Sequence, residues 1–135
     1  MDALDRALKK NKASAYVMMG SSDYADMRYL THFVTADPII YIRRAGERGC
    51  IIVSQMEYSR AQREAATSSV TRADAGLLTI LEEEKDRWRA LARMVIDNAG
   101  GKILVPPDFP YALRHHLRER AEVLIDTGTV ASMRE

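Results

Sequence analysis

The chain has 135 residues, of which 47% are hydrophobic and 29% charged, a composition typical of one globular domain and not of a disordered segment. Twenty basic against nineteen acidic residues leave a net charge of +1, so no overall field draws the protein to nucleic acid, an anionic membrane or an acidic substrate. The one cysteine, Cys50, lies in an apolar run, which favours a buried thiol in a reducing compartment.

The amino-terminal segment, residues 1–12, carries charges throughout and lacks the apolar stretch of a secretory signal. Within it Ala3, Leu4, Ala7 and Leu8 repeat at helical spacing, which predicts a short amphipathic helix. No stretch of the chain approaches the ~18 apolar residues of a membrane span. We therefore expect a cytoplasmic protein with no membrane partner.

Three apolar runs follow and predict strands. Residues 15–19 are apolar without interruption and stop at Gly20, as in a strand buried on both faces. Residues 38–43 and 49–54 are rich in β-branched side chains and are separated by five residues of turn-forming composition. These two runs predict an antiparallel hairpin.

The second half of the chain begins with two capping boxes, in which a serine or threonine stands three residues before a glutamate. They start at Ser54 and Thr79 and predict helices over about 55–66 and 80–98. Residues 102–105 then predict a strand, and Asp108 is placed to cap a last helix. Residues 123–125 predict the final strand.

The order of these elements indicates the fold class. Helices alternate with strands after an antiparallel hairpin, and no repeat or Gly/Ser linker divides the chain. We therefore predict a single α/β domain over residues 1–135, with a mixed β-sheet of about five or six strands flanked by helices.

The richest polar and aromatic segment, residues 21–33, lies between the first strand and the hairpin. In an open α/β sheet such a loop forms a ligand crevice, where Arg28 would bind a carboxylate and Tyr29 or Phe33 would line the pocket. The simpler interpretation, which these residues alone favour, is a short helix packed on the sheet edge through Met27, Leu30 and Phe33 with Arg28 in solvent. The candidate ligand-loop residues are Arg28, Tyr29, His32 and Phe33.

No catalytic residue is predicted. Ser22, Asp23 and His32 supply the residue types of a hydrolytic triad, but no activating turn presents the serine. Neither of the glycine-rich phosphate-binding motifs occurs. The arginines of the later helices have no aromatic stacking platform beside them, so we expect no nucleic-acid partner.

Metal binding is also not predicted. His115 and His116 each have helical spacing to Glu119, yet adjacent histidines point about 100° apart on a helix and the last helix supplies no further ligand of good geometry. The pattern therefore predicts a solvated helix face.

Several short features together resemble the amino-terminal domain of the creatinase, prolidase and aminopeptidase P family. They are the element order, the sequence Arg-Tyr-Leu-Thr-His-Phe at 28–33, and Glu57 with Tyr58 at a helix start after the hairpin. That family commonly has a Tyr-Leu-Thr-Gly-Phe-like element here. His32 stands where the family usually has glycine, and Asp26 stands where asparagine is frequent. Residues 130–135 are similar to the junction that leads into the family's next domain.

The resemblance implies a noncatalytic domain placed before a pita-bread catalytic domain, which is absent from this chain. In the family the catalytic domain binds two divalent metal ions, here expected as Mn, Co or Zn. None of its ligands matches a position of this sequence, so we expect no cofactor in this chain. The implied partners are the C-terminal catalytic domain and a second copy in a homodimer, with the domain helping to enclose the substrate entrance of an Xaa-Pro peptidase.

Two other function classes stay open at this point. One is a stand-alone small-molecule-binding or regulatory domain that uses the 21–33 loop, with Arg28 recognising an anion. The other is a structural or interaction protein, which an exposed apolar patch and a concentration-dependent dimer would distinguish.

Overall fold

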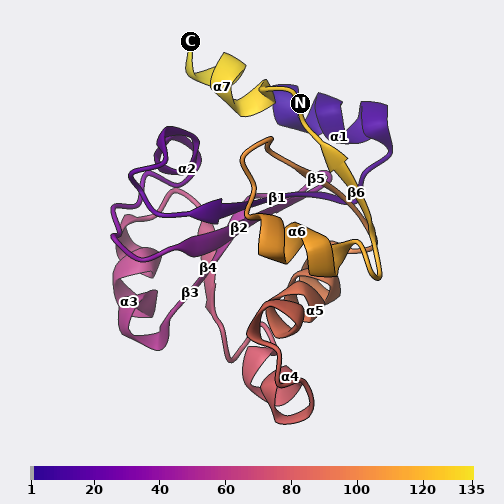
Figure 1. The fold of residues 1–135 in the computed structure, drawn as a ribbon. Helices are drawn as coiled ribbons and strands as arrows, with labels where there is room; N and C mark the ends of the chain where they lie inside the picture. The colour runs from indigo at the N-terminus through magenta and orange to yellow at the C-terminus, as the bar shows by residue number, and fades with distance from the viewer. Residues whose placement is uncertain (1) are drawn as a thin grey trace.

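The computed structural model describes residues 2–135, which form a six-stranded mixed sheet with helices on both faces (Figure 1). The helices are α1 (Ala3–Asn11), α2 (Ala25–Thr31), α3 (Gln55–Glu64), α4 (Leu77–Glu83), α5 (Arg87–Ala99), α6 (Tyr111–Leu117) and α7 (Thr129–Arg134). The strands are β1 (Ala15–Gly20), β2 (Ile39–Arg44), β3 (Cys50–Val53), β4 (Ser68–Thr71), β5 (Lys102–Val105) and β6 (Glu122–Ile125). The predicted fold class is confirmed.

The strand order is β4-β3-β2-β1-β5-β6. β1 pairs antiparallel with β2 and parallel with β5, so the sheet changes from hairpin to crossover architecture at this strand. The predicted hairpin is confirmed, with Ile40 of β2 opposite Ile52 of β3. Next to β1, the Ser14 hydroxyl donates a hydrogen bond of 2.8 Å to the Lys102 carbonyl, across 88 positions of sequence. Parallel pairs β3–β4 and β5–β6 complete the sheet.

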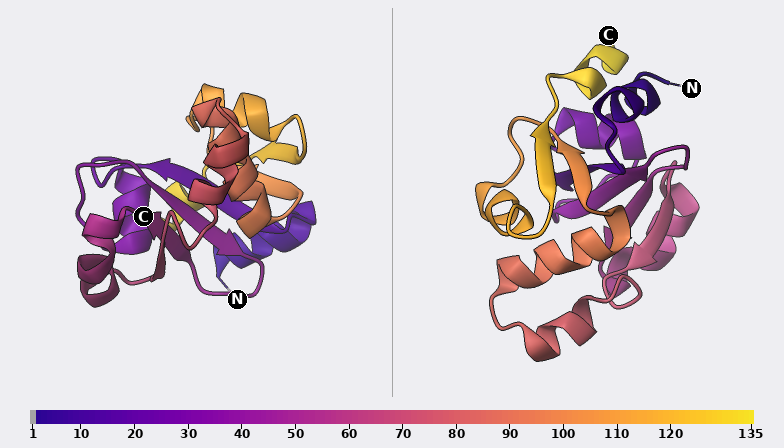
Figure 2. Two further views of the ribbon diagram at one scale, coloured as in Figure 1. Left: turned by 90° about the horizontal axis from the view of Figure 1, so that it is seen from below. Right: turned by 90° about the vertical axis from the view of Figure 1, so that its right-hand side faces the viewer.

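The core has two layers, one on each face of the sheet, because successive side chains of a strand point to opposite faces. Ala15 and Val17 of β1 join the layer covered by α4, α5 and α6. Tyr16 and Met18 join the layer covered by α1, α2, α3 and α7. Two views at right angles show the helices on each side of the sheet (Figure 2). A fully buried leucine such as Leu4 of α1 contributes about 1.5–3 kcal/mol.

The helix predicted over 80–98 is wrong in its boundaries, because the structure has two helices there. Gly76, with φ of 98°, precedes α4, and Thr79 lies exposed inside that helix instead of capping it. α5 starts afresh at Arg87, where the side chain of Asp86 accepts a 3.0 Å hydrogen bond from the Arg89 N–H. An aspartate is a strong N-cap, so it begins a new helix in the middle of a periodic run.

Three other local expectations need correction. Ser54 does precede α3, but its hydroxyl forms no cap hydrogen bond. Asp108 does not cap α6, which begins after Pro110; its carboxylate instead accepts a 2.8 Å hydrogen bond from the Tyr24 hydroxyl. The sequence patterns also missed β4 and α7, whose places depend on contacts with distant segments.

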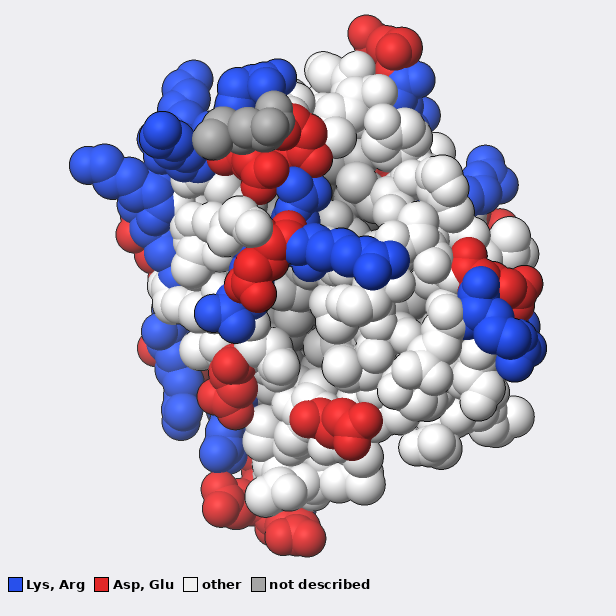
Figure 3. Space-filling model, turned by 180° about the vertical axis from the view of Figure 1, so that it is seen from behind, with Lys and Arg blue, Asp and Glu red and all other residues white. Residues whose placement is uncertain are grey.

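Within residues 2–135 no helix combines the length and apolar character needed to cross a membrane. Charged side chains of both signs gather over the left and upper parts of the face seen in Figure 3, and a broad uncharged area lies to the right of its centre. Cys50 is a free thiol on β3 and is half-buried, so it is more exposed than the buried thiol that its apolar neighbours predicted.

Candidate functional site

The segment singled out between β1 and the hairpin is mostly helical. α2 buries Met27 completely, as the simpler interpretation of this segment predicted. The helix ends at His32, whose N–H donates to the Arg28 carbonyl at 2.9 Å and whose φ is 50°. This left-handed backbone conformation is one that glycine adopts without strain and that a side chain adopts at a cost.

Three of the four predicted loop residues lie together. Arg28, Tyr29 and His32 line an open hollow of about 430 Å³, which Arg134 of α7 borders on the other side. Phe33 does not line it: its side chain is 0% exposed and belongs to the core, where the Arg60 guanidinium lies 4.2 Å from the ring centroid. The placement of Phe33 as a pocket wall is therefore corrected, because alternation after the helix end turns its ring inward.

The hollow is bounded by a contact between α2 and α7 that sequence reasoning missed. Arg134 donates from Nε to Oδ1 of the buried Asp26 at 2.7 Å. The hydroxyl of Tyr29 donates to the Met133 carbonyl at 3.1 Å. Together these bonds fix the last helix against α2, and no local pattern could have joined residues so far apart in sequence.

The chemistry available at the hollow is binding rather than bond breaking. Ser22 is buried, and its hydroxyl both donates to the Thr35 carbonyl and accepts from the Thr35 N–H, at 2.8 and 2.9 Å. Burial and the hydrogen bond to Asp108 raise the pKa of Tyr24 well above its ordinary value, so its hydroxyl stays protonated at neutral pH. Within residues 2–135, Arg28 forms no ion pair, which leaves its guanidinium toward solvent.

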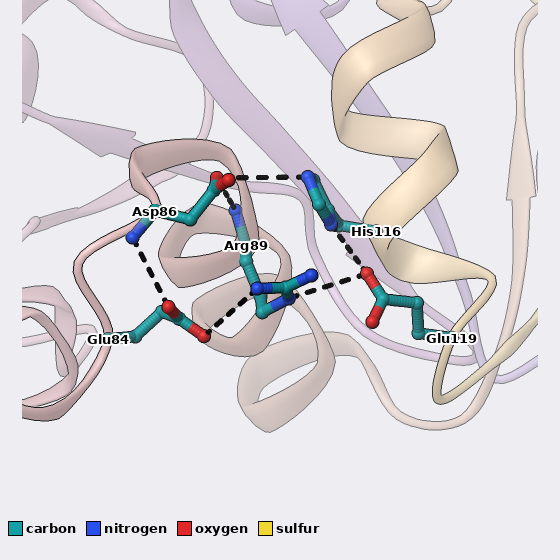
Figure 4. A network of polar contacts seen from close by, with 5 residues as sticks. All are labelled: Glu84, Asp86, Arg89, His116 and Glu119. Carbon is teal, nitrogen blue, oxygen red and sulfur yellow. Dashed lines mark hydrogen bonds and ion pairs between the residues drawn. The ribbon is translucent and has the colours of Figure 1, made fainter.

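A second polar cluster joins the end of α6 to the start of α5 (Figure 4). Donor atoms of His115, His116 and Glu119 all lie within 4.8 Å of one another. The two histidine rings meet edge to face with 5.0 Å between their centroids, which is closer than their separation of about 100° around the helix had indicated. The absence of a metal site on this helix stays a prediction. The other residues of this cluster are Asp86, Arg89 and Glu84, which contact His116 and Glu119 or each other.

Hydrogen bonds lower the pKa values of two carboxylates in this cluster, Glu119 and Asp86. The hydrogen bond with His116 is the main reason why the pKa of Glu119 lies below its ordinary value. The hydrogen bond from the Arg89 N–H is the main cause that lowers the pKa of Asp86. Both groups are consequently anionic at neutral pH.

Comparison with known proteins identifies the family. Residues 1–135 match the family model described as the creatinase/prolidase N-terminal domain. The chain belongs to the creatinase/prolidase N-terminal domain family. The resemblance drawn from the sequence is thereby confirmed. Among curated proteins, none matches the chain.

Solved structures share the fold of this creatinase/prolidase N-terminal domain. The prolidase from Pyrococcus horikoshii OT3 is 13% identical with a TM-score of 0.70, over 98% of this chain and 33% of that one. The Xaa-Pro dipeptidase from Bacillus anthracis is 18% identical with a TM-score of 0.70, over 98% and 34%. The creatinase/prolidase N-terminal domain of an X-Pro dipeptidase from Streptococcus pyogenes is 14% identical with a TM-score of 0.60, over 98% and 97%. The chain thus spans about a third of the length of the first two proteins.

Proposed function

We propose that this chain is the noncatalytic amino-terminal domain of an Xaa-Pro peptidase-type metallohydrolase, in which it supports oligomer assembly and the substrate entrance of the catalytic domain. The observation that carries the proposal is the family match over residues 1–135. Prolidases of the same fold are about three times as long, so the part of them outside the match has room for a catalytic domain. That domain would hold the two divalent metal ions expected of the parent enzyme.

The hollow lined by Arg28, Tyr29 and His32 supports the entrance role. Arg134 borders this hollow and is fixed to α2 through Asp26, so a domain joined after Glu135 would emerge beside it. A guanidinium and an imidazole at such a rim suit the free carboxylate of a short peptide.

Peptidase assays test the noncatalytic assignment. The purified chain is incubated with an Xaa-Pro dipeptide and an Xaa-Pro tripeptide in the presence of Mn²⁺, Co²⁺ or Zn²⁺. A full-length prolidase assayed in parallel is the positive control. We expect no release of amino acid above the protein-free blank. Hydrolysis that rises with both protein and metal concentration would overturn the proposal.

The homodimer part of the proposal rests on an apolar groove. The groove measures about 510 Å³ and is lined between α4, α5 and the sheet mainly by Ile40, Ile52, Leu77, Leu81, Leu91 and Met94. Leu78 at its rim is 60% exposed. Ile40, Ile52, Leu77 and Met94 are nearly buried, so the apolar surface open to a partner is chiefly that of Leu78, and an exposed apolar side chain at the rim of a groove is compatible with a protein interface.

Sedimentation velocity at several concentrations tests the dimer. We expect the average mass to rise with concentration and the rise to be lost in Leu78→Glu. Met56→Glu on α3, where the side chain is 92% exposed and away from the groove, is the matched control and should associate as the unmodified chain does. A chain that stays monomeric at high concentration contradicts the proposal.

Anion binding is a second candidate function, favoured by the exposed Arg28, which forms no ion pair among residues 2–135 and lies beside His32 and Arg134. A ligand that binds only the native state raises its melting temperature. A panel of small carboxylates would therefore stabilise the chain, and Arg28→Gln would remove the shift. Equal shifts in both proteins would assign the effect to another site.

A further inference from the structure

The carboxyl end of α6 gathers three donor groups of the kinds that transition metals prefer. One nitrogen each from His115 and His116 and a carboxylate oxygen of Glu119 lie within 4.8 Å of one another. In a tetrahedral zinc site with metal–ligand bonds of about 2.0–2.1 Å, the donors stand roughly 3.4 Å apart. His116 Nδ1 and Glu119 Oε1 are at 2.5 Å, so an ion would separate this pair and draw the exposed His115 inward.

The orientation of His116 is the observation that goes beyond mere proximity. Its Nδ1 faces Glu119, while its Nε2 faces Oδ1 of Asp86 at 3.7 Å (Figure 4). Metal-bound histidines almost always direct the second ring nitrogen to a carboxylate or carbonyl, which fixes the tautomer that leaves the first nitrogen free to bind. Asp86 lies on the side where that outer carboxylate is expected, although at 3.7 Å it would have to approach the ring to accept the hydrogen bond.

Glu119 is oriented by a second outer group. Arg89 Nε lies 3.5 Å from Oε1 of Glu119, and the other end of the guanidinium lies 3.8 Å from Glu84. Figure 4 shows both dashed contacts to Glu119 ending on the same oxygen, so its second oxygen carries none of the interactions drawn. The three carboxylates drawn in Figure 4 outnumber the one guanidinium, but Arg114 and Arg118 lie beside His115 and Glu119 and offset that charge, so the donor atoms of the site, and not its net charge, favour a metal ion.

We propose that His115, His116 and Glu119 form a binding site for a late first-row transition metal ion such as Zn²⁺, with water completing the coordination. Two imidazoles and one carboxylate are the ligand set of zinc sites with an open position, whereas Mg²⁺ and Ca²⁺ prefer oxygen ligands alone. The site is separate from the two-ion centre expected in the catalytic domain. It lies on the sheet face opposite the α2–α7 contact.

Calorimetric titration of the chain with ZnCl₂ tests the site. We expect one ion per chain, no heat from Mg²⁺ or Ca²⁺, and at least tenfold weaker binding in His116→Ala and in Glu119→Gln. Asp86→Asn retains a residue able to cap α5 and should weaken binding about 10–100-fold through the outer contact alone. His32→Asn removes the one other histidine, at a left-handed position that asparagine tolerates, and should bind like the unmodified chain.

Imidazole NMR spectra provide a readout that does not depend on a variant's stability. Zn²⁺ should shift the His115 and His116 ring signals together and leave those of His32 unchanged. Circular dichroism establishes that each variant is folded. Undiminished zinc binding in folded His116→Ala or Glu119→Gln, ring shifts confined to His32, or no zinc binding by the unmodified chain would each overturn the proposal. Arg114 and Arg118 line a second hollow together with His115 and Glu119, so binding of phosphate in place of zinc would also refute the proposal.

Discussion

Asp26 and Arg134 stand 108 positions apart in the sequence, yet Nε of Arg134 lies 2.7 Å from Oδ1 of Asp26. The aspartate is 9% exposed, so its charge is largely removed from water and depends on this partner. The pair fastens α7 to α2, at the border of the hollow that carries Arg28.

Arg134→Gln should lower the free energy of unfolding by about 1–2 kcal/mol, because a hydrogen bond to a mostly buried carboxylate is lost while the guanidinium was itself partly in water. Urea denaturation measures the change. Arg28→Gln, at the same hollow but without an ion pair, is the control and should stay within about 0.5 kcal/mol of the unmodified chain. Equal effects of the two substitutions would contradict the role of the pair.

The start of α1 should make stability depend on pH. Burial alone would raise the pKa of Asp2, but hydrogen bonds from the Asp5 N–H and from Arg43 outweigh it and lower that pKa. A lowered pKa in the folded state stabilises the protein above the unfolded value of about 3.9, and this stabilisation is lost as the pH falls through the folded value. Asp2→Asn retains the cap but removes the charge.

Urea denaturation of both proteins at pH 7 and pH 3 measures this effect. Asp2→Asn should be less stable than the unmodified chain at pH 7, and the difference should shrink at pH 3. A difference that is constant with pH would show that the carboxylate charge contributes nothing.

Gly49 has no room for a side chain. A Cβ placed there would lie 2.6 Å from ring atoms of Tyr41, which is buried and cannot swing away. Gly49→Ala should therefore destabilise the fold by about 1–3 kcal/mol, the usual cost of overpacking. Gly101→Ala, where no atom lies within 4 Å of the new Cβ, serves as the control in thermal denaturation. A loss as large in Gly101→Ala would point to a backbone effect instead.

The α4–α5 break gives a comparison between two capping residues. Asp86→Ala should lower the melting temperature, because the Arg89 N–H loses its acceptor. Thr79→Ala should change it little, since Thr79 is an exposed residue within α4. A larger loss of melting temperature in Thr79→Ala than in Asp86→Ala would instead support a single long helix capped at Thr79.

The substitution Phe33→Ala tests whether Phe33 serves the core or a bound ligand. Phe33→Ala should cost about 3–5 kcal/mol in unfolding free energy, as for other buried aromatic side chains. If the residue instead served a ligand at the surface, the substitution would affect carboxylate binding with little loss of stability.

The strands of the central sheet could be predicted from sequence because they are buried on both faces and therefore read as continuous apolar runs. β4 is different. It begins with Ser68 and Ser69 and shows no run of apolar residues, and it forms a strand because its backbone pairs in parallel with β3. The α4–α5 break was missed because the pattern around Thr79 looked like a helix start, whereas Thr79 lies inside α4 and Asp86 caps the next helix.

The candidate site was predictable only where its residues are local. Arg28, Tyr29 and His32 fall within one turn of helix and its cap, so a single segment pointed to them. The contact between Asp26 and Arg134 depends on the folded sheet, which brings α2 and α7 together. The metal-ligand geometry of His115 and His116 depends on side-chain torsions and on Asp86 from another helix, neither of which spacing along the sequence reveals.

The position of β1 between β2 and β5 has a consequence during synthesis of the chain. β1 and β2 are complete early, but the second neighbour of β1 begins at Lys102. Until that residue leaves the ribosome, one edge of an apolar strand has unpaired backbone groups. The amino-terminal half is then open to pairing with another chain, and the sheet closes only after β5 and β6 have been made.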